Sequence, residues 1–176
     1  ILSLDARSGK NVWESEPLPR WKPMHVLFGP TLVVYDDVVL FAGGEKTHMS
    51  YMGWGSKDIG QDTMTVLSAE TGMKLWTADS PYYGYNSPED LFVIDGLVWP
   101  VGNVAPGQQI MDVALDLKTG EVKRRRSGSP PPTGGHARCY RNKATDRFML
   151  LGRTGVEFID LEAGDPLRHN WIRGTC

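Results

Sequence analysis

Six side chains in three short segments have the chemistry to bind a small ligand. Histidine, arginine and tyrosine can donate hydrogen bonds to anionic or carbonyl groups, and asparagine and glutamate oxygens suit a hard cation. The candidate ligand-binding residues are His136, Arg138, Tyr140, Arg173, Asn86 and Glu89. Ordinary packing, capping and solvation also account for these residue types, so both interpretations stay open. The catalytic residues, if there are any, are unknown from the sequence.

The two cysteines, Cys139 and Cys176, are too few for a disulfide framework, but they could form a single bridge. Each stands shortly after an arginine, in segments that we expect at equivalent places in neighbouring sheets. If their strands are neighbours, the two Cα atoms could lie within the roughly 4.4–6.8 Å that a disulfide needs. Two free or buried thiols are the alternative.

Sequence signatures of several enzyme classes are absent. The chain has no Gly-x-Ser-x-Gly, His-Glu-x-x-His or phosphate-loop motif, so hydrolase, metalloprotease and nucleotide-binding functions lack support. It has no Cys-x-x-Cys pair, and its four histidines do not have the spacing of zinc ligands. We therefore predict no metal site.

The composition is that of an ordinary globular protein. The 176 residues carry a formal charge of −2, with 40% hydrophobic and 23% charged residues, which disfavours disordered and strongly basic chains. The one basic run, Lys123–Arg126, is expected to be a solvated strand edge protected by its own charges, so we predict no nucleic-acid partner. No apolar stretch approaches the roughly 20 residues of a membrane-spanning helix.

A repeat indicates the elements that must position these side chains. Four segments align without gaps on a glycine and share the pattern apolar-Asp/Ser-x-x-Thr/Ser/Ala-Gly, followed by a second short strand. The repeat residues are Asp5, Gly9, Trp13, Ser68, Gly72, Trp76, Asp116, Gly120, Asp160 and Gly164. The last two spacings between the glycines, 48 and 44 residues, fit the roughly 40–50 residues of a four-stranded propeller blade.

Each part of the repeat has a physical reason. The Asp or Ser side chain can accept hydrogen bonds from backbone amides of the turn, and the glycine supplies a positive φ. Trp13 and Trp76 each lie four residues past their glycine, where a large ring can pack on the next blade. The third and fourth copies carry Arg124 and Arg168 there, so we expect a weaker contact or one made by an arginine stem.

Apolar runs upstream of each copy predict the inner strands. Residues 31–35 and 38–42 flank Asp36-Asp37, and residues 90–94 and 97–99 flank Asp95-Gly96, which is a strong hairpin signal. Upstream of the last copy, residues 137–140 and 148–151 flank a polar segment, 142–146, which we expect to be a turn. The Gly- and Met-rich residues 45–62 are predicted to be an inserted loop.

These patterns predict an all-β fold, a β-propeller with about three complete four-stranded blades and partial blades at both ends. The blades are predicted at residues 24–78, 82–126 and 136–168, with outer strands of one blade in 1–14 and the start of another in 171–176. Three blades cannot close a ring, and the chain starts at Ile1 without a methionine. We therefore expect a fragment of a larger ring, with the remaining blades of its own full-length chain as partners.

The four copies resemble the PQQ-like repeat of the quinoprotein alcohol dehydrogenase-like β-propellers, whose blades carry an Ala-x-Asp-x-x-Thr-Gly-x-x-x-Trp docking motif. The copies that end in Trp13 and Trp76 match best, and Ala114 to Gly120 matches the first half. The resemblance covers nearly the whole chain and implies rings of about six to eight blades. WD40 propellers are disfavoured because no Gly-His…Trp-Asp signature occurs, and a kelch propeller has only the Gly43-Gly44 pair in its favour.

The resemblance bears on function less than on fold, because function depends on sites grafted onto the fold. The family includes dehydrogenases that use PQQ and calcium, and a non-catalytic lipoprotein of the outer-membrane β-barrel assembly machinery. Asn86, Glu89, Asp90 and Trp171 have chemistry suited to a PQQ site, but the vicinal Cys-Cys pair typical of the alcohol dehydrogenases is absent.

We therefore expect a non-catalytic scaffold, or a platform that binds a ligand or another protein, without a cofactor. The resemblance implies an exported, periplasmic protein. One alternative is part of a PQQ-dependent dehydrogenase, with PQQ and calcium as cofactors. A second alternative is an accessory propeller fused to an unrelated enzyme domain.

Overall fold

The computed structural model describes the strands and turns of an all-β chain. The described residues are 1–18, 31–42, 62–80, 90–103, 109–110, 113–125, 142–152, 156–162 and 166–169. Within this part of the chain, no helix has the length and apolar character needed to span a membrane. The three segments that hold the candidate ligand-binding residues are 82–90, 133–141 and 170–176, and all of them except residue 90 lie outside the described residues, as does most of the predicted inserted loop.

The described strands form four antiparallel sheets, which we call blades 1 to 4. Blade 1 has two strands, β1 (Leu2–Leu4) and β2 (Asn11–Glu14). Blade 2 has the order β3-β4-β5-β6; its strands are β3 (Thr31–Tyr35), β4 (Val38–Ala42), β5 (Asp62–Ser68) and β6 (Lys74–Ser80).

Blades 3 and 4 repeat this order. Blade 3 has the order β7-β8-β10-β11, with a short extra strand paired to β8; its strands are β7 (Asp90–Ile94), β8 (Leu97–Asn103), β9 (Gln109–Ile110), β10 (Val113–Asp116) and β11 (Val122–Arg125). Blade 4 has the order β12-β13-β14-β15; its strands are β12 (Lys143–Ala144), β13 (Phe148–Gly152), β14 (Val156–Asp160) and β15 (Pro166–His169).

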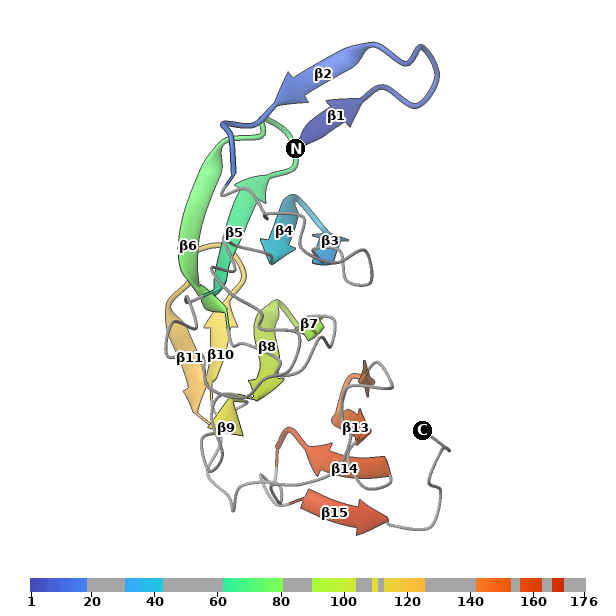
Figure 1. The fold of residues 1–176 in the computed structure, drawn as a ribbon, viewed down its shortest axis with the longest axis vertical. Coiled ribbons are helices and arrows are strands. Elements are labelled where there is room, and N and C mark those ends of the chain that lie inside the picture. The colour runs from blue at the N-terminus through green and yellow to red at the C-terminus, as the bar shows by residue number, and fades with distance from the viewer. Residues whose placement is uncertain are drawn as a thin grey trace, which may run out of the picture.

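The blades stand side by side along an arc (Figure 1). In blades 2 and 3 the first strands, β3 and β7, lie toward the concave side, and the last strands, β6 and β11, lie on the convex side. Four-stranded antiparallel sheets arranged radially around a common centre are the architecture of a β-propeller. The chain is therefore an all-β chain that forms part of a propeller.

The inner hairpins form where the turn chemistry favours them. Asp95 and Gly96 have φ values of 50° and 69°, the left-handed values that a two-residue turn needs between strands with a right-handed twist. Asp36 has φ 48° in the corresponding turn of blade 2, and Asp is one of the residue types that tolerate this conformation. Ile94 pairs with Leu97 and Tyr35 with Val38, so both hairpins close with the same register.

The apolar core lies between the blades rather than within one of them. One cluster joins Val38, Leu40 and Val66 of blade 2 to Val98 and Leu117 of blade 3. A second cluster joins blade 3 to blade 4; its buried members are Trp99, Ala114, Met149, Ile159 and Leu161. Because alternate residues of a strand face opposite sides of its sheet, each blade contributes to both neighbours.

One sequence expectation is wrong in detail. The polar segment 142–146 was expected to be a turn, but Lys143–Ala144 form β12 and pair with Leu150 and Met149. The turn is shorter because the Thr145 hydroxyl accepts hydrogen bonds from the backbone N–H groups of Phe148 (2.8 Å) and Arg147 (3.3 Å). A threonine that closes a turn in this way leaves the polar residues before it free to join the strand.

Candidate functional site

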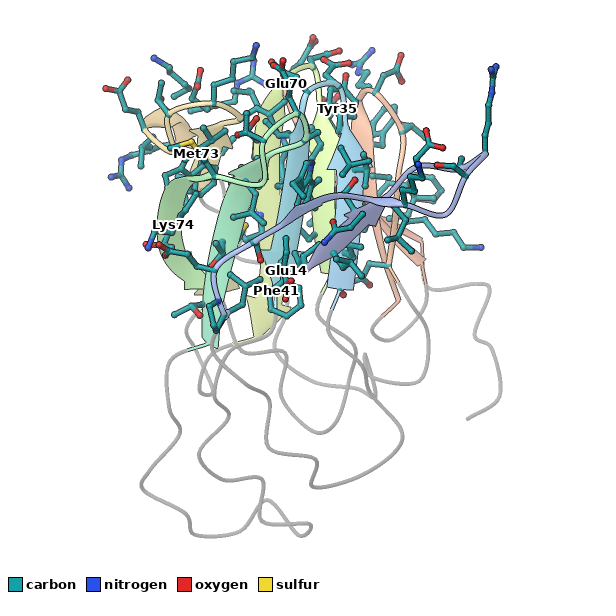
Figure 2. The ribbon with its side chains drawn as sticks, turned by 90° about the horizontal axis from the view of Figure 1, so that it is seen from above. Glu14, Tyr35, Phe41, Glu70, Met73 and Lys74 are labelled. Atoms are coloured by element: carbon teal, nitrogen blue, oxygen red, sulfur yellow. The ribbon has the colours of Figure 1, made fainter. Side chains whose placement is uncertain are left out.

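The repeated turns of the first three copies share one backbone hydrogen bond. In each of the first three copies, the glycine N–H donates to the backbone oxygen of the Asp or Ser four residues earlier, at 2.8–2.9 Å. Gly9, Gly72 and Gly120 have φ values of 67°, 71° and 74°, which an L side chain rarely adopts. Figure 2 shows Glu70, in the second of these turns, at the same edge as Tyr35, the last residue of β3. Gly164 lies outside the described residues.

Carboxylates of the repeat hold the turns closed. Asp5 Oδ1 accepts from Ser8 N at 2.7 Å and from Ser8 Oγ at 2.6 Å. Asp116 Oδ1 accepts from Lys118 N at 3.0 Å and from Thr119 N at 2.9 Å. Ser68 Oγ accepts from Thr71 N at 3.3 Å, a longer bond to an uncharged acceptor.

These hydrogen bonds lower the pKa of both aspartates. The Ser8 hydroxyl, and then the Ser8 backbone N–H, lower the pKa of Asp5, because both stabilise its ionised form. The backbone N–H of Thr119 has the largest effect on Asp116 and lowers its pKa in the same way. Both carboxylates are therefore held as anions that serve as hydrogen-bond acceptors.

Trp13 and Trp76 reach from one blade to the turn of the next. Trp13 Nε1 donates to the Ala69 carbonyl at 2.8 Å, and Trp76 Nε1 donates to the Leu117 carbonyl at 3.0 Å. Each ring also lies against the glycine of that turn. A Cβ added at Gly72 would stand 2.4 Å from Trp13 Cε3, and one at Gly120 would stand 2.7 Å from Trp76 Cδ2. The glycine is therefore needed both for its backbone conformation and for the space that the ring occupies.

Arg124 replaces the tryptophan between blades 3 and 4. Its Nη1 donates to the Leu161 carbonyl at 3.2 Å. Leu161 has the same position in its turn as Leu117 and Ala69 in theirs, three residues before the repeat glycine. The expected arginine contact is thus a hydrogen bond to the same backbone acceptor that the tryptophans use.

The residue that accepts this bond also connects the turn to the inner hairpin of its own blade. Ala69 N donates to Asp37 O at 2.8 Å, Leu117 N to Gly96 O at 3.0 Å, and Leu161 N to Arg147 O at 2.9 Å. Its carbonyl binds the preceding blade while its amide binds its own blade, so we call Ala69, Leu117 and Leu161 the node residues. The sequence did not reveal them, because the interacting groups are backbone atoms; only their fixed distance from the glycine marks them.

Blade 4 uses its repeat aspartate differently. Asp160 Oδ1 accepts from Glu162 N at 2.9 Å, while Oδ2 accepts from Arg147 Nη2 at 2.8 Å and Nε at 3.1 Å. The hydrogen bond to the Asp160 carboxylate raises the pKa of Arg147. The Arg147 Cζ atom also lies 5.1 Å from the centre of the Phe148 ring. The fourth copy has Ala163 where others have Ser or Thr, so its aspartate lacks a neighbouring hydroxyl at that position.

The residues predicted to bind a ligand are not brought together in the described part of the chain. His136, Arg138, Tyr140, Arg173, Asn86 and Glu89 all lie outside it, as do Cys139, Cys176 and Trp171. Asp90 is described only through its backbone, as the first residue of β7. Among the described residues, no group of three or more His, Cys, Asp or Glu could hold a metal ion.

Comparison with known proteins bears on the fold. No protein-family model and no curated protein sequence matches the chain. It is similar to the computationally designed Ika8 protein, with 15% identity and a TM-score of 0.51 over 95% of this chain and 42% of that one. It also matches BamB from Moraxella catarrhalis, with 15% identity and a TM-score of 0.48 over 91% of this chain and 39% of that one. The chain thus spans about two fifths of the length of each. At this identity the likeness to Ika8, a designed propeller, bears on architecture alone, and it agrees with the arc of blades: the chain folds as part of a β-propeller.

Proposed function

We propose that the chain is part of a non-catalytic propeller of the PQQ-like repeat type, from an exported protein, and serves as a scaffold that binds another protein. One observation carries the scaffold role: the side chain four residues past the repeat glycine donates a hydrogen bond that holds one blade to the next. The Trp13, Trp76 and Arg124 donors end on node carbonyls of the following blade. The same contact is made at three successive junctions, which is what a modular framework requires.

The ionisation of the turn carboxylates supports a structural role. A general acid or base works best with a pKa near the operating pH, and a catalytic carboxylate is usually raised toward that range by burial. The pKa values of Asp5 and Asp116 are shifted the other way, by hydrogen bonds that stabilise the charged form. These carboxylates are suited to hold a turn and poorly suited to transfer protons near neutral pH.

The geometry of the docking contact supports assignment to the PQQ-like repeat. In the motif Ala-x-Asp-x-x-Thr-Gly-x-x-x-Trp, the aspartate closes the turn, the glycine makes room, and the tryptophan joins two blades. Asp116 with Gly120, and Gly120 with Trp76, perform these roles here. Export and a protein partner are parts of the same proposal, as what the resemblance implies for a non-catalytic member with this repeat type.

Reconstitution tests the non-catalytic part of the proposal against the PQQ-dependent alternative. The purified chain is mixed with PQQ and Ca²⁺, and quinone absorbance and dye-linked alcohol oxidation are followed. We expect no saturable change in absorbance and no oxidation above the level of PQQ and Ca²⁺ without protein. Saturable binding of PQQ with alcohol oxidation would overturn the proposal and assign the chain to a quinoprotein dehydrogenase.

Affinity capture tests the binding part. The full-length propeller is immobilised and exposed to an extract of exported proteins. An Arg124→Ala, Trp76→Ala variant, which lacks two of the bonds between blades, is treated in the same way and tests whether retention requires the intact framework. We expect one protein to be retained in a fixed ratio by the unaltered propeller and less by the variant. Retention of no protein in a fixed ratio would contradict the scaffold proposal.

A further inference from the structure

The outer edge of β11 is a free strand edge. β11 ends the strand order of blade 3 and pairs, among the described residues, with β10 alone. It lies on the convex side of the arc (Figure 1), where the outermost strand of a blade faces solvent in a complete ring as well. All four of its residues are exposed. The free edge is therefore a property of the rim and does not depend on how many blades the chain contains.

Cations stand on both faces of this edge. Arg124 pairs with Ala114, a member of the cluster between blades 3 and 4, so it lies on the face toward blade 4. Arg125 pairs with Val113, which packs against the cluster between blades 2 and 3, so it lies on the opposite face. Lys123 is the additional residue at the point where the register shifts. A strand added at this edge would therefore meet an arginine on either face.

Most of this positive charge is uncompensated. Lys123 Nζ lies 3.0 Å from Glu121 Oε2. Arg124 donates to an uncharged carbonyl, and within the described residues neither Arg124 nor Arg125 forms an ion pair with a carboxylate. The chain as a whole has a formal charge of −2. The β11 edge is thus a local concentration of positive charge on a slightly acidic protein.

The equivalent edge of blade 2 does not have this character. The outer strand β6 contains one basic and one acidic residue, Lys74 and Asp79. Charged residues on an edge strand hinder pairing with uncharged strands and with strands of the same charge. A strand of opposite charge is favoured instead, because opposite charges on neighbouring strands stabilise a sheet. The cations of β11 can therefore select a partner strand as well as exclude others.

We propose that the free edge of β11 is a docking site for an extended acidic segment of a partner protein, which adds to blade 3 as a further antiparallel strand. The edge presents backbone N–H and C=O groups, and a peptide main chain matches both, whereas a phosphate backbone offers acceptors alone. Carboxylates at neighbouring positions of the docked strand lie on opposite faces, one beside Arg124 and one beside Arg125. The inference rests on the proposed function, because it names the surface and the chemistry by which the scaffold would bind a protein.

The outer strands of a second copy do not supply such a segment. Antiparallel pairing of two copies of β11 would place cations opposite cations, and like charges at opposite positions destabilise a sheet. The outer strands β2 and β6 each contain a single acidic residue, so neither offers two neighbouring carboxylates. The occupant is therefore a strand from another protein.

Titration of the complete chain with a synthetic peptide tests the site. The probe is Thr-Val-Glu-Glu-Glu-Val-Thr with blocked ends, and the control peptide has the same sequence with every backbone amide N-methylated, which keeps the charge and removes the donors. We expect saturable binding of the probe that weakens at least about fivefold between about 20 mM and about 0.5 M salt. At about ten times the half-saturating concentration, amide exchange in Val122–Arg125 should slow about tenfold. The control should bind at least about tenfold more weakly.

Charge reversals locate the binding on β11. Lys123→Glu combined with Arg125→Glu should weaken binding of the probe by about tenfold or more, and both positions are exposed, so the fold should persist. Arg124 is left unchanged because it joins blades 3 and 4. Lys74→Glu, an exposed position on the outer strand β6, is the matched control and should bind the probe as the unaltered chain does.

Three results would overturn the proposal: equal binding of the N-methylated peptide, unchanged exchange in β11, or equal binding by the double variant. Tighter binding of a single-stranded oligonucleotide with the same number of charges would assign the edge to a nucleic acid instead. Affinity capture with the Lys123→Glu, Arg125→Glu variant separates this inference from the proposed function. A partner that this variant retains as well as the unaltered propeller does would leave the scaffold function standing and exclude the β11 edge as its binding site.

Discussion

Blades 2 and 3 meet through Trp76, whereas blades 3 and 4 meet through Arg124, and both residues donate to the node carbonyl of the next turn. The bonds measure 3.0 Å and 3.2 Å. What differs is the surface that accompanies the bond, because the tryptophan ring lies against Gly120 while the arginine is exposed. The constant requirement is thus a long side chain with a donor, and the aromatic ring is an addition to it.

The Arg124 junction has its aromatic residue in a different place. Trp99 lies buried in the cluster between blades 3 and 4, together with the small Ala114. The equivalent positions at the Trp76 junction are occupied by Leu40 and Val66. A large residue beside a small one fills about the same space as two residues of middle size, so the inter-blade volume is conserved while the ring moves from the rim to the core.

Replacement of Trp99 should therefore have the largest effect of any single substitution considered for this comparison. Trp99 exposes only 1% of its surface, and Trp99→Ala would leave a cavity beside Ala114 and Met149. We expect a loss of about 3–5 kcal/mol in the free energy of unfolding, measured by urea denaturation. A Trp99→Ala, Ala114→Val variant should recover part of the loss. A loss below about 1 kcal/mol would show that the core does not hold this junction.

Replacement of the turn glycines should separate the two roles of glycine. Gly9 and Gly120 have similar φ values, 67° and 74°, but a Cβ at Gly9 would meet nothing within 4 Å, whereas one at Gly120 would collide with Trp76. Gly9→Ala should cost about 1–2 kcal/mol from backbone strain alone. Gly120→Ala should cost about 1–3 kcal/mol more, because the ring must move. Equal losses in urea denaturation would mean that the ring-on-glycine contact contributes nothing.

The next prediction compares the two docking side chains directly. Trp76→Ala removes a hydrogen bond and a half-buried ring, and should lower the free energy of unfolding by about 2–3 kcal/mol. Arg124→Ala removes a bond from an exposed side chain, and should cost about 1 kcal/mol. Urea denaturation of both variants measures the difference. A larger loss for Arg124→Ala would reverse our interpretation of the two junctions.

Local signals explain what could be predicted from the sequence. The all-β architecture, the Asp95-Gly96 hairpin and the repeated turns all depend on residues close together in the chain, whose preferences are strong. The strand β12 was missed because Lys143 is polar and the closing hydroxyl of Thr145 gives no periodic signal. An element with only two residues has too little pattern to be found in this way.

Contacts between blades were harder to predict. The sequence indicated that Trp76 would pack on the next blade, but the acceptor is the backbone of Leu117, which carries no side-chain signal. Arg124 was expected to weaken or replace the contact, and only the three-dimensional register shows that it uses the Leu161 carbonyl. The ligand-binding candidates, His136 and Arg173 among them, remain predictions because they lie outside the described residues.

An ion pair across the Trp76 junction provides the smallest and most condition-dependent difference. Lys118 Nζ lies 2.9 Å from Asp37 Oδ2, and both side chains are more than half exposed. At the Arg124 junction the equivalent positions hold Glu162 and Gly96, which cannot form this pair, and Arg147 binds Asp160 within its own blade instead. The contribution should be small because exposed ion pairs gain little in water and are screened by salt.

The pH dependence of this contribution follows from the two pKa shifts. The Lys118 hydrogen bond lowers the pKa of Asp37, so the stability it gives is present above the unfolded pKa and is lost as the pH falls through the folded one, below about pH 4. Asp37, with smaller effects of Asp36 and Asp116, raises the pKa of Lys118, so the stability that Lys118 contributes is present below the unfolded pKa and is lost as the pH rises beyond about 10.4.

Urea denaturation of the unaltered chain and of Lys118→Met tests this dependence. The two free energies of unfolding should differ by a constant amount from about pH 5 to 9, and should converge below about pH 4 or in about 1 M salt. Lys123→Met is the matched control: Lys123 of β11 pairs with Glu121 two residues earlier in the same blade, and its loss should leave the junction intact. A difference for Lys118→Met that persists in acid and in high salt would show that the lysine acts through its packing, and the charge complementarity of the two turns would then play no part in joining blades 2 and 3.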